Sequence, residues 1–188
     1  MIDKHRIFVG LKTSGHLSSV IPMIKSTVDD RKQLIKWING WNLHLTLSFI
    51  GEITSSQIKN LDQDLNRIIS FNSFDITVNG TGLFPDSRNP KTLWLDIIKG
   101  REKLINIQEE VESIALKFQS NVKSTIFSPH ITIARVKAGN KNVNLDLSTF
   151  LNAVYSDIKI PVKTIYLFKS QLLEQGVKYS VISEYTLK

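Results

Sequence analysis

The chain has 188 residues, no cysteine, and 24 lysines and arginines against 17 aspartates and glutamates, a formal net charge of +7 at pH 7. The lack of cysteine excludes disulfides, thiol catalysis and thiolate metal sites. No apolar run approaches the roughly 20 residues of a membrane-spanning helix, and the first residues lack the apolar stretch of a signal peptide. We therefore expect one cytoplasmic domain over residues 1–188 without a membrane partner. The positive charge favours polyanionic partners such as nucleic acid.

Hydrophobic periodicity predicts strands and helices in alternation along the chain. Strands are expected at residues 5–11, 43–50, 73–80, 91–98, 129–136, 158–169 and 177–187. Apolar residues at helical spacing predict helices over about 17–28, 54–69 and 101–119, with a short helix near 148–155. The segments 36–42, 80–90 and 137–148 have the composition of turns and loops.

The stretch 43–50 reads Leu-His-Leu-Thr-Leu-Ser-Phe-Ile and contains a His-x-Thr-x motif with aliphatic x positions. Successive side chains of a strand point to opposite faces. Strict alternation therefore predicts a polar face with His44, Thr46 and Ser48. The opposite, apolar face would carry Leu45, Leu47 and Phe49.

The stretch 129–136 repeats the motif as Pro-His-Ile-Thr-Ile-Ala-Arg-Val, 86 residues further along the chain. Alternation again puts His130 and Thr132 on one face of the strand. Two of the four histidines of the chain thus belong to the repeat, and together they predict a two-histidine site. We expect His5 and His16 to be structural, at the start of a strand and on an exposed helical turn.

The order of the predicted elements puts a His-x-Thr strand beside a helix in each half of the chain. This order predicts an α+β fold of two similar, pseudo-symmetric lobes, each with a mostly antiparallel sheet and helices outside. An old duplication would explain the repeat. Each lobe would then supply one motif to a central cleft.

Two histidines on opposite sides of a substrate can hold opposite protonation states, because imidazole titrates near neutral pH. One then activates a nucleophile while the other protonates the leaving group. In-line displacement at phosphorus suits this arrangement, and the hydroxyls of Thr46 and Thr132 would donate to phosphate oxygens. Arg135 can add a charged contact to phosphate, although alternation puts it on the apolar face.

The sequence signals no metal and no cofactor. Two histidines without nearby Asp, Glu or Cys residues make a poor zinc site. There is no Gly-x-Ser-x-Gly for a serine nucleophile, no Walker loop and no Gly-x-Gly-x-x-Gly. We therefore expect the chemistry to need neither a metal nor a cofactor.

Over nearly its whole length the chain resembles the RNA 2′,3′-cyclic phosphodiesterases of the 2′-5′ RNA ligase family, in the two-histidine phosphoesterase superfamily. Beyond the two motifs, the resemblance lies in several short stretches. They are Arg-Ile-Phe-Val-Gly at 6–10, Gly-Leu-Phe-Pro at 82–85, Pro-Lys-Thr-Leu-Trp-Leu at 90–95, Ile-Tyr-Leu-Phe-Lys-Ser-Gln-Leu at 165–172 and Gly-Val-Lys-Tyr at 176–179.

The resemblance implies a bilobal fold with a pseudo-twofold cleft, and opening of an RNA-terminal 2′,3′-cyclic phosphate to a 2′-phosphate. It implies that His44 is the proton donor to the leaving 3′ oxygen and His130 the proton acceptor that activates water. Thr46 and Thr132 would bind the phosphate. Members of the family also join or cleave 2′-5′ linkages, so 2′-5′ RNA ligation is an expected side activity.

Two alternatives stay open. The same site would serve a phosphodiesterase for 2′-5′ oligonucleotides or other cyclic nucleotides, and a non-catalytic module would bind RNA ends without cutting them. The expected partners are RNA 3′ ends or small nucleotides, and we expect a monomer. Trp37, Trp41 and Trp94 are candidates for stacking on a base.

Overall fold

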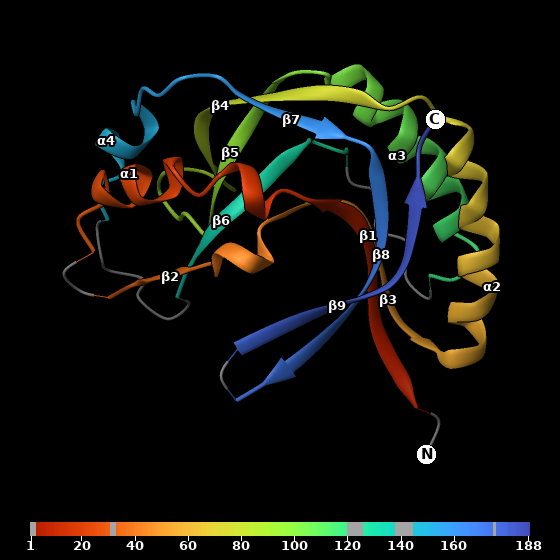
Figure 1. Cartoon of the computed structure of the whole chain (residues 1–188). Coiled ribbons are helices and arrows are strands. Elements are labelled where there is room, and N and C mark those ends of the chain that lie inside the picture. Colours follow the sequence, from red (N-terminus) through yellow and green to blue (C-terminus); the bar gives the residue numbers. More distant parts are fainter. Residues whose placement is uncertain (1–2, 31–32, 120–125, 138–144, 175) are drawn as a thin grey trace.

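The computed structural model describes residues 3–30, 33–119, 126–137, 145–174 and 176–188. Within these residues, nine strands form one sheet in the order β7-β4-β5-β6-β3-β1-β8-β9, with β2 paired to β6 (Figure 1). The strands are β1 (Lys4–Lys12), β2 (Ile35–Trp37), β3 (His44–Thr54), β4 (Phe74–Phe84), β5 (Thr92–Lys99), β6 (His130–Val136), β7 (Ile158–Val162), β8 (Thr164–Leu173) and β9 (Gly176–Thr186). Their described pairings are all antiparallel.

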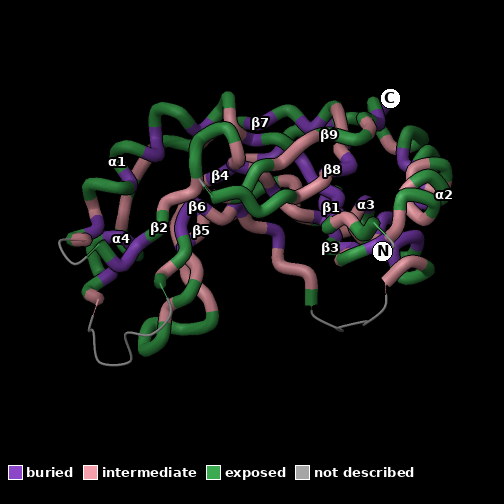
Figure 2. Tube along the Cα trace, turned by 90° about the horizontal axis from the view of Figure 1, so that it is seen from below, coloured by how far each residue is buried: buried purple, intermediate pink, exposed green. Residues whose placement is uncertain are grey.

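The helices gather at the two ends of the molecule, with strands between them (Figures 1 and 2). One end carries α1 (Val20–Ser26) and α4 (Ser148–Leu151), and the other carries α2 (Ser55–Leu65) and α3 (Arg101–Ala115). Short 3-10 turns complete the chain: η1 (Ser14–His16), η2 (Gly40–Asn42) and η3 (Asn66–Ser70). The predicted α+β fold with a mostly antiparallel sheet and outer helices is confirmed.

The sheet has two halves that meet at the motif strands. Strands β1, β3, β8 and β9 form one half, and β2, β4, β5, β6 and β7 form the other. The two halves join where Leu45 of β3 pairs with Ile131 of β6. These are the residues between histidine and threonine in each motif, so the repeat lies at the centre of the fold.

Both motif strands contain a β-bulge directly after the threonine. In β3, Thr46 and Ser48 pair with consecutive residues of β1, so Leu47 is an extra residue. In β6, Thr132 and Ala134 pair with consecutive residues of β5, so Ile133 is the extra one. An extra residue reverses the alternation of the side chains that follow it.

The reversal corrects the predicted faces of β3. Ser48 is 4% exposed and accepts a hydrogen bond from Gln119 Nε2 at 3.4 Å, just beyond α3, so it does not belong with His44. Phe49, predicted for the core, is 67% exposed, and its ring centroid lies 6.1 Å from that of Phe8. The first six residues of β3 and β6 have the same burial pattern, so Phe49 and Arg135 hold equivalent, exposed positions.

Several predicted boundaries differ from those of the structure, and for strands the pairing partner sets the end. β4 continues into the predicted loop as far as Phe84, which pairs with Thr92. The long strand expected over 158–169 divides at Lys163, because β7 pairs with β4 whereas β8 pairs with β1. The turn-rich segment 36–42 contributes the end of β2 and all of η2. Most of the predicted polar loop, residues 138–144, lies outside the described residues.

Gly10 of β1 pairs with Thr46, next to the bulge of β3. A Cβ atom there would collide with the backbone oxygen of Leu45, and backbone cannot move aside as a side chain can. We expect Gly10→Ala to lower the free energy of unfolding by about 1–3 kcal/mol, the usual cost of overpacking. Urea denaturation measures this loss. Gly15→Ala is the matched control, since a Cβ atom at Gly15 meets nothing within 4 Å; equal losses would contradict the prediction.

Candidate active site

The two motif histidines are held in the same way. The Nδ1 atom of His44 lies 2.6 Å from the carbonyl oxygen of Asn42, and that of His130 lies 2.7 Å from the carbonyl oxygen of Ser128. A carbonyl oxygen can only accept, so Nδ1 carries the proton in both rings. Nε2 is then the nitrogen that takes or gives a proton in each imidazole.

Aromatic side chains fix the plane of each imidazole. The ring of Tyr179 meets His44 edge-on with centroids 4.9 Å apart, and Phe8 lies 5.0 Å from the same imidazole. On the other side, Phe84 meets His130 edge-on at 5.1 Å. Edge-to-face contacts of this kind are favourable and directional, so both rings are preorganised.

The two His-Thr pairs share one face of the sheet. Leu45 and Ile131 are direct partners, so their side chains lie on the same face. The residues on either side of them along each strand point to the opposite face. We call this second face the motif face; it carries His44, Thr46, His130 and Thr132. Antiparallel pairing brings each histidine next to the threonine of the other motif.

The surroundings lower the pKa of both histidines below the ordinary value of 6.5. Burial is the largest cause, because a low-dielectric environment disfavours the imidazolium. The hydrogen bonds to the carbonyls of Asn42 and Ser128 raise the pKa values and partly oppose this effect, and the nearby charge of Arg135 lowers both pKa values further. His130 also lowers the pKa of His44, which shows that the two rings interact.

Arg135 lies within electrostatic reach of both motifs. Its positive charge lowers the pKa of His44 and His130, and it partly opposes burial, which raises the pKa of Tyr179. Strict alternation places it on the apolar face, and this is wrong, because the bulge at Ile133 turns the exposed Arg135 away from the core. The guanidinium is therefore available for a bidentate contact to an anion held between the histidines.

The strand partners of the two histidines differ in charge. Lys12 of β1 is the direct strand partner of His44, whereas Asp96 of β5 is the direct partner of His130. The Asp96 carboxylate raises the pKa of His130 and accepts a hydrogen bond from Arg101 Nη1 at 2.8 Å. The two imidazoles thus have the same hydrogen bonds but different electrostatic surroundings.

Residues 22–172 match the family model of the 2′-5′ RNA ligase superfamily. The match covers most of the chain and both His-x-Thr motifs. The chain belongs to this superfamily.

Two relatives share a more specific name than that of the superfamily. The chain is 35% identical to the RNA 2′,3′-cyclic phosphodiesterase of Aquifex aeolicus over 187 residues, which cover 97% of each protein. It is 31% identical to the RNA 2′,3′-cyclic phosphodiesterase of Aeropyrum pernix over 153 residues, 80% of this chain and 85% of that protein.

Solved structures share the fold of this superfamily member. A protein of Thermus thermophilus superposes with a TM-score of 0.78 at 22% identity, over 97% of both chains. Escherichia coli LigT in complex with 3′-AMP gives a TM-score of 0.78 at 20% identity, over 99% of both chains. At these identities the similarity concerns the fold, and it supports the antiparallel sheet described above.

The sequence did not predict several residues that shape the site of this superfamily member. Asn42 holds His44 through its carbonyl and also donates from Nδ2 to the carbonyl of Val177 at 2.8 Å, which ties η2 to the β8–β9 hairpin. Tyr179 comes from that hairpin. Asn42 and Ser128 each stand two residues before a motif histidine. This shared spacing is the feature of the sequence that could have indicated their role.

The remaining histidines and the tryptophans have different surroundings. The Nε2 atom of His5 lies 3.2 Å from both Ser55 Oγ and an Asp3 carboxylate oxygen, and His16 is exposed on η1. Trp94 lies 6.0 Å from His130 between ring centroids, whereas Trp41 is 89% exposed on η2. Base stacking by the tryptophans stays a prediction.

Metal and membrane features can be judged only for the described residues. Within these ranges, no group of three or more His, Cys, Asp or Glu side chains is placed to hold a metal ion. Likewise, no described helix has the length and apolar character needed to span a membrane.

Asp96→Asn should lower the pKa of His130, because the variant removes the carboxylate that favours its imidazolium. The pKa of His44 should change less, since Asp96 is the strand partner of His130. Titration of both imidazoles by NMR measures the two values. Asp75→Asn on β4 is the control, because Asp75 forms an ion pair with Lys159 at 2.8 Å and is not a strand neighbour of either histidine. An unchanged His130 titration would contradict the prediction.

Proposed function

We propose that this chain is a phosphodiesterase that opens RNA-terminal 2′,3′-cyclic phosphates to 2′-phosphates without a metal or cofactor. The observation that carries the proposal is the pair of equivalent imidazoles on one face, each anchored through Nδ1 with Nε2 left for proton transfer. The family match and the names of the two relatives support the same reaction and substrate class.

In the proposed reaction, Nε2 of His130 takes a proton from water as the water oxygen bonds to phosphorus. The bond from phosphorus to the 3′ oxygen breaks, and Nε2 of His44 gives that oxygen a proton. The products are a 2′-phosphate and a free 3′ hydroxyl. The resemblance to the family assigns these two roles, and the histidines on either side of the phosphate suit in-line displacement.

Three further side chains would stabilise the phosphorane-like transition state. The hydroxyls of Thr46 and Thr132 would donate to the non-bridging oxygens as negative charge accumulates there. Arg135 would add a charged contact. The anionic phosphate would also raise the lowered pKa values of both histidines, and the role of His44 as the protonated donor follows from the resemblance to the family.

The test is incubation with 2′,3′-cyclic AMP and with a short RNA that ends in a 2′,3′-cyclic phosphate, in the presence of a chelator. We expect ring opening, with the product identified as the 2′-phosphate by phosphorus NMR. Absence of ring opening, or a 3′-phosphate product, would contradict the proposal. We further propose that residues 1–188 form a single domain that acts as a monomer on RNA 3′ ends or small nucleotides. Measurement of the molecular size in solution tests the monomer, and the same assays test the substrates.

A second candidate keeps the site and changes the substrate to 2′-5′ linked oligonucleotides or other cyclic nucleotides. The superfamily name favours including 2′-5′ joining and cleavage in the test. Comparison of kcat/KM across these substrates separates the two candidates. The non-catalytic module is disfavoured, because recognition alone has no need of two imidazoles with matched Nδ1 anchors.

A further inference from the structure

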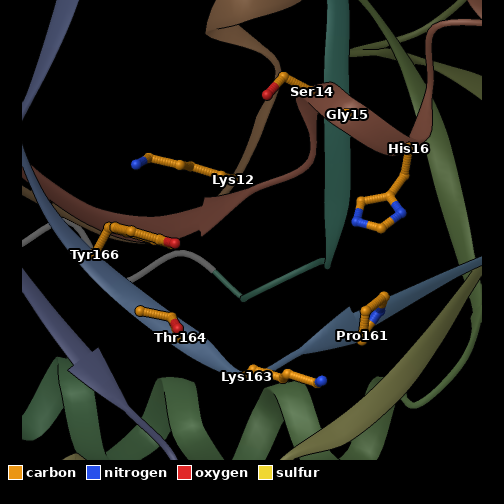
Figure 3. Close-up of a pocket in the computed structure, with 8 residues that line it drawn as sticks. All are labelled: Lys12, Ser14, Gly15, His16, Pro161, Lys163, Thr164 and Tyr166. Atoms are coloured by element: carbon orange, nitrogen blue, oxygen red, sulfur yellow. The ribbon is translucent and has the colours of Figure 1, made fainter.

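A separate pocket lies where the chain crosses between the two halves of the sheet. It has a volume of about 230 Å³ and lies between the end of β1 with η1 on one side and the β7–β8 junction on the other (Figure 3). Its lining residues are Lys12, Ser14, Gly15, His16, Pro161, Lys163, Thr164 and Tyr166. Neither motif histidine lines it.

The chemistry of this pocket suits an anion. Lys12, His16 and Lys163 supply side-chain nitrogen atoms, and three hydroxyl side chains line the pocket with them. The Lys12 ammonium lies 4.1 Å from the centroid of the Tyr166 ring, which holds the side chain over the sheet. The lining contains no carboxylate; Glu184 of β9 contacts Lys12 from outside, at 3.8 Å.

Strand pairing connects this pocket to the motif face. Lys12 is the direct partner of His44, so their side chains share a face. Two residues earlier on the same strand, Gly10 pairs with Thr46 on one side and with Tyr166 on the other. Gly10 has no side chain, so this residue places no side-chain atoms between Thr46, the proposed phosphate-binding threonine, and Tyr166 of the pocket.

We propose that this pocket binds a phosphodiester of the RNA strand on the 5′ side of the terminal cyclic phosphate. The proposal rests on the proposed function, because it takes the cyclic end to lie between the two histidines. A mononucleotide reaches only the motif face, whereas a longer strand places a further phosphate beside Lys12 and Lys163. The pocket thereby gives the enzyme a preference for oligonucleotides over mononucleotides.

Lys163→Ala tests this preference. The side chain of Lys163 is exposed, while its backbone oxygen keeps the hydrogen bond from Leu187 N at 2.9 Å, so the substitution leaves the β7–β8 junction intact. We expect kcat/KM for a tetranucleotide with a 2′,3′-cyclic end to fall about tenfold. Turnover of 2′,3′-cyclic AMP should stay unchanged. The slope of log affinity for RNA against log salt should become shallower by about one.

Lys59→Ala on α2 is the matched control, because Lys59 is also an exposed lysine and does not line the pocket. An unchanged preference for the tetranucleotide in Lys163→Ala, or an equal loss for both substrates, would overturn the proposal. Failure of the proposed function instead appears as no turnover of 2′,3′-cyclic AMP by the unaltered protein. In that case, fluorescence anisotropy still measures the affinity for a labelled tetranucleotide that ends in a 2′-phosphate. A lower affinity in Lys163→Ala would then support binding in the pocket.

Discussion

Replacement of either motif histidine should reduce turnover of an RNA 2′,3′-cyclic phosphate by about 10²–10⁴-fold, the usual contribution of one general acid or base. His44→Ala removes the proposed donor and His130→Ala the proposed acceptor. Each ring is also packed against aromatic side chains, so alanine leaves a gap in both cases. His44→Asn and His130→Asn are therefore the sharper variants, because the amide can still donate to the carbonyl that holds Nδ1 but cannot titrate.

Single-turnover rates at saturating substrate measure these losses, and thermal unfolding reports whether each variant stays folded. The single-turnover rate of the double variant should be only slightly lower than that of the less active single variant, because residues that act as a unit in catalysis have non-additive effects. His5→Gln is the control, since His5 contacts Ser55 and Asp3 and lies outside the motif strands. Full turnover in either single variant would disprove two-histidine catalysis.

Alternation along a strand correctly predicted which side chains share a face up to the threonine of each motif, and it failed after the threonine. His44, Thr46, His130 and Thr132 follow from the period of two alone. Ser48, Phe49 and Arg135 do not, because one extra residue in each strand reverses the faces after the threonine. Nothing in an apolar pair such as Leu47 or Ile133 signals a bulge, since the bulge depends on the partner strand.

The supporting residues of the site come from parts of the chain that only the tertiary structure brings together. The hydrogen bond that connects η2 to the last hairpin joins Asn42 and Val177, which are 135 residues apart in sequence. Tyr179 reaches His44 because β8 and β9 fold back along β1. Local periodicity contains no information on such contacts, so the two-histidine pair was predictable and its aromatic and electrostatic surroundings were not.

The second large effect should come from Arg135, whose charge acts on both histidines. Arg135→Met removes a proposed contact to the phosphate, and kcat/KM should fall about 10–100-fold, the range for a hydrogen bond to a charged group. The same change should raise the pKa of His44 and His130, because the positive charge that disfavours both imidazolium ions is gone. The acidic limb of the pH–rate profile should therefore move to higher pH.

Arg135→Lys separates the two roles of this residue. Lysine keeps the positive charge but loses the bidentate fork of the guanidinium. We expect a smaller loss of kcat/KM and almost no displacement of the pH–rate profile, whereas the methionine variant should show both effects.

Arg67→Met on η3 is the control, because Arg67 contacts Glu110 at 3.6 Å on the outer surface. Wild-type kcat/KM in Arg135→Met would exclude a contact to the phosphate. An unmoved profile would mean that the guanidinium lies too far from the imidazoles to influence their protonation. Because both effects depend on the bulge that turns Arg135 to the motif face, this pair of variants tests the geometry of β6 as well as the chemistry.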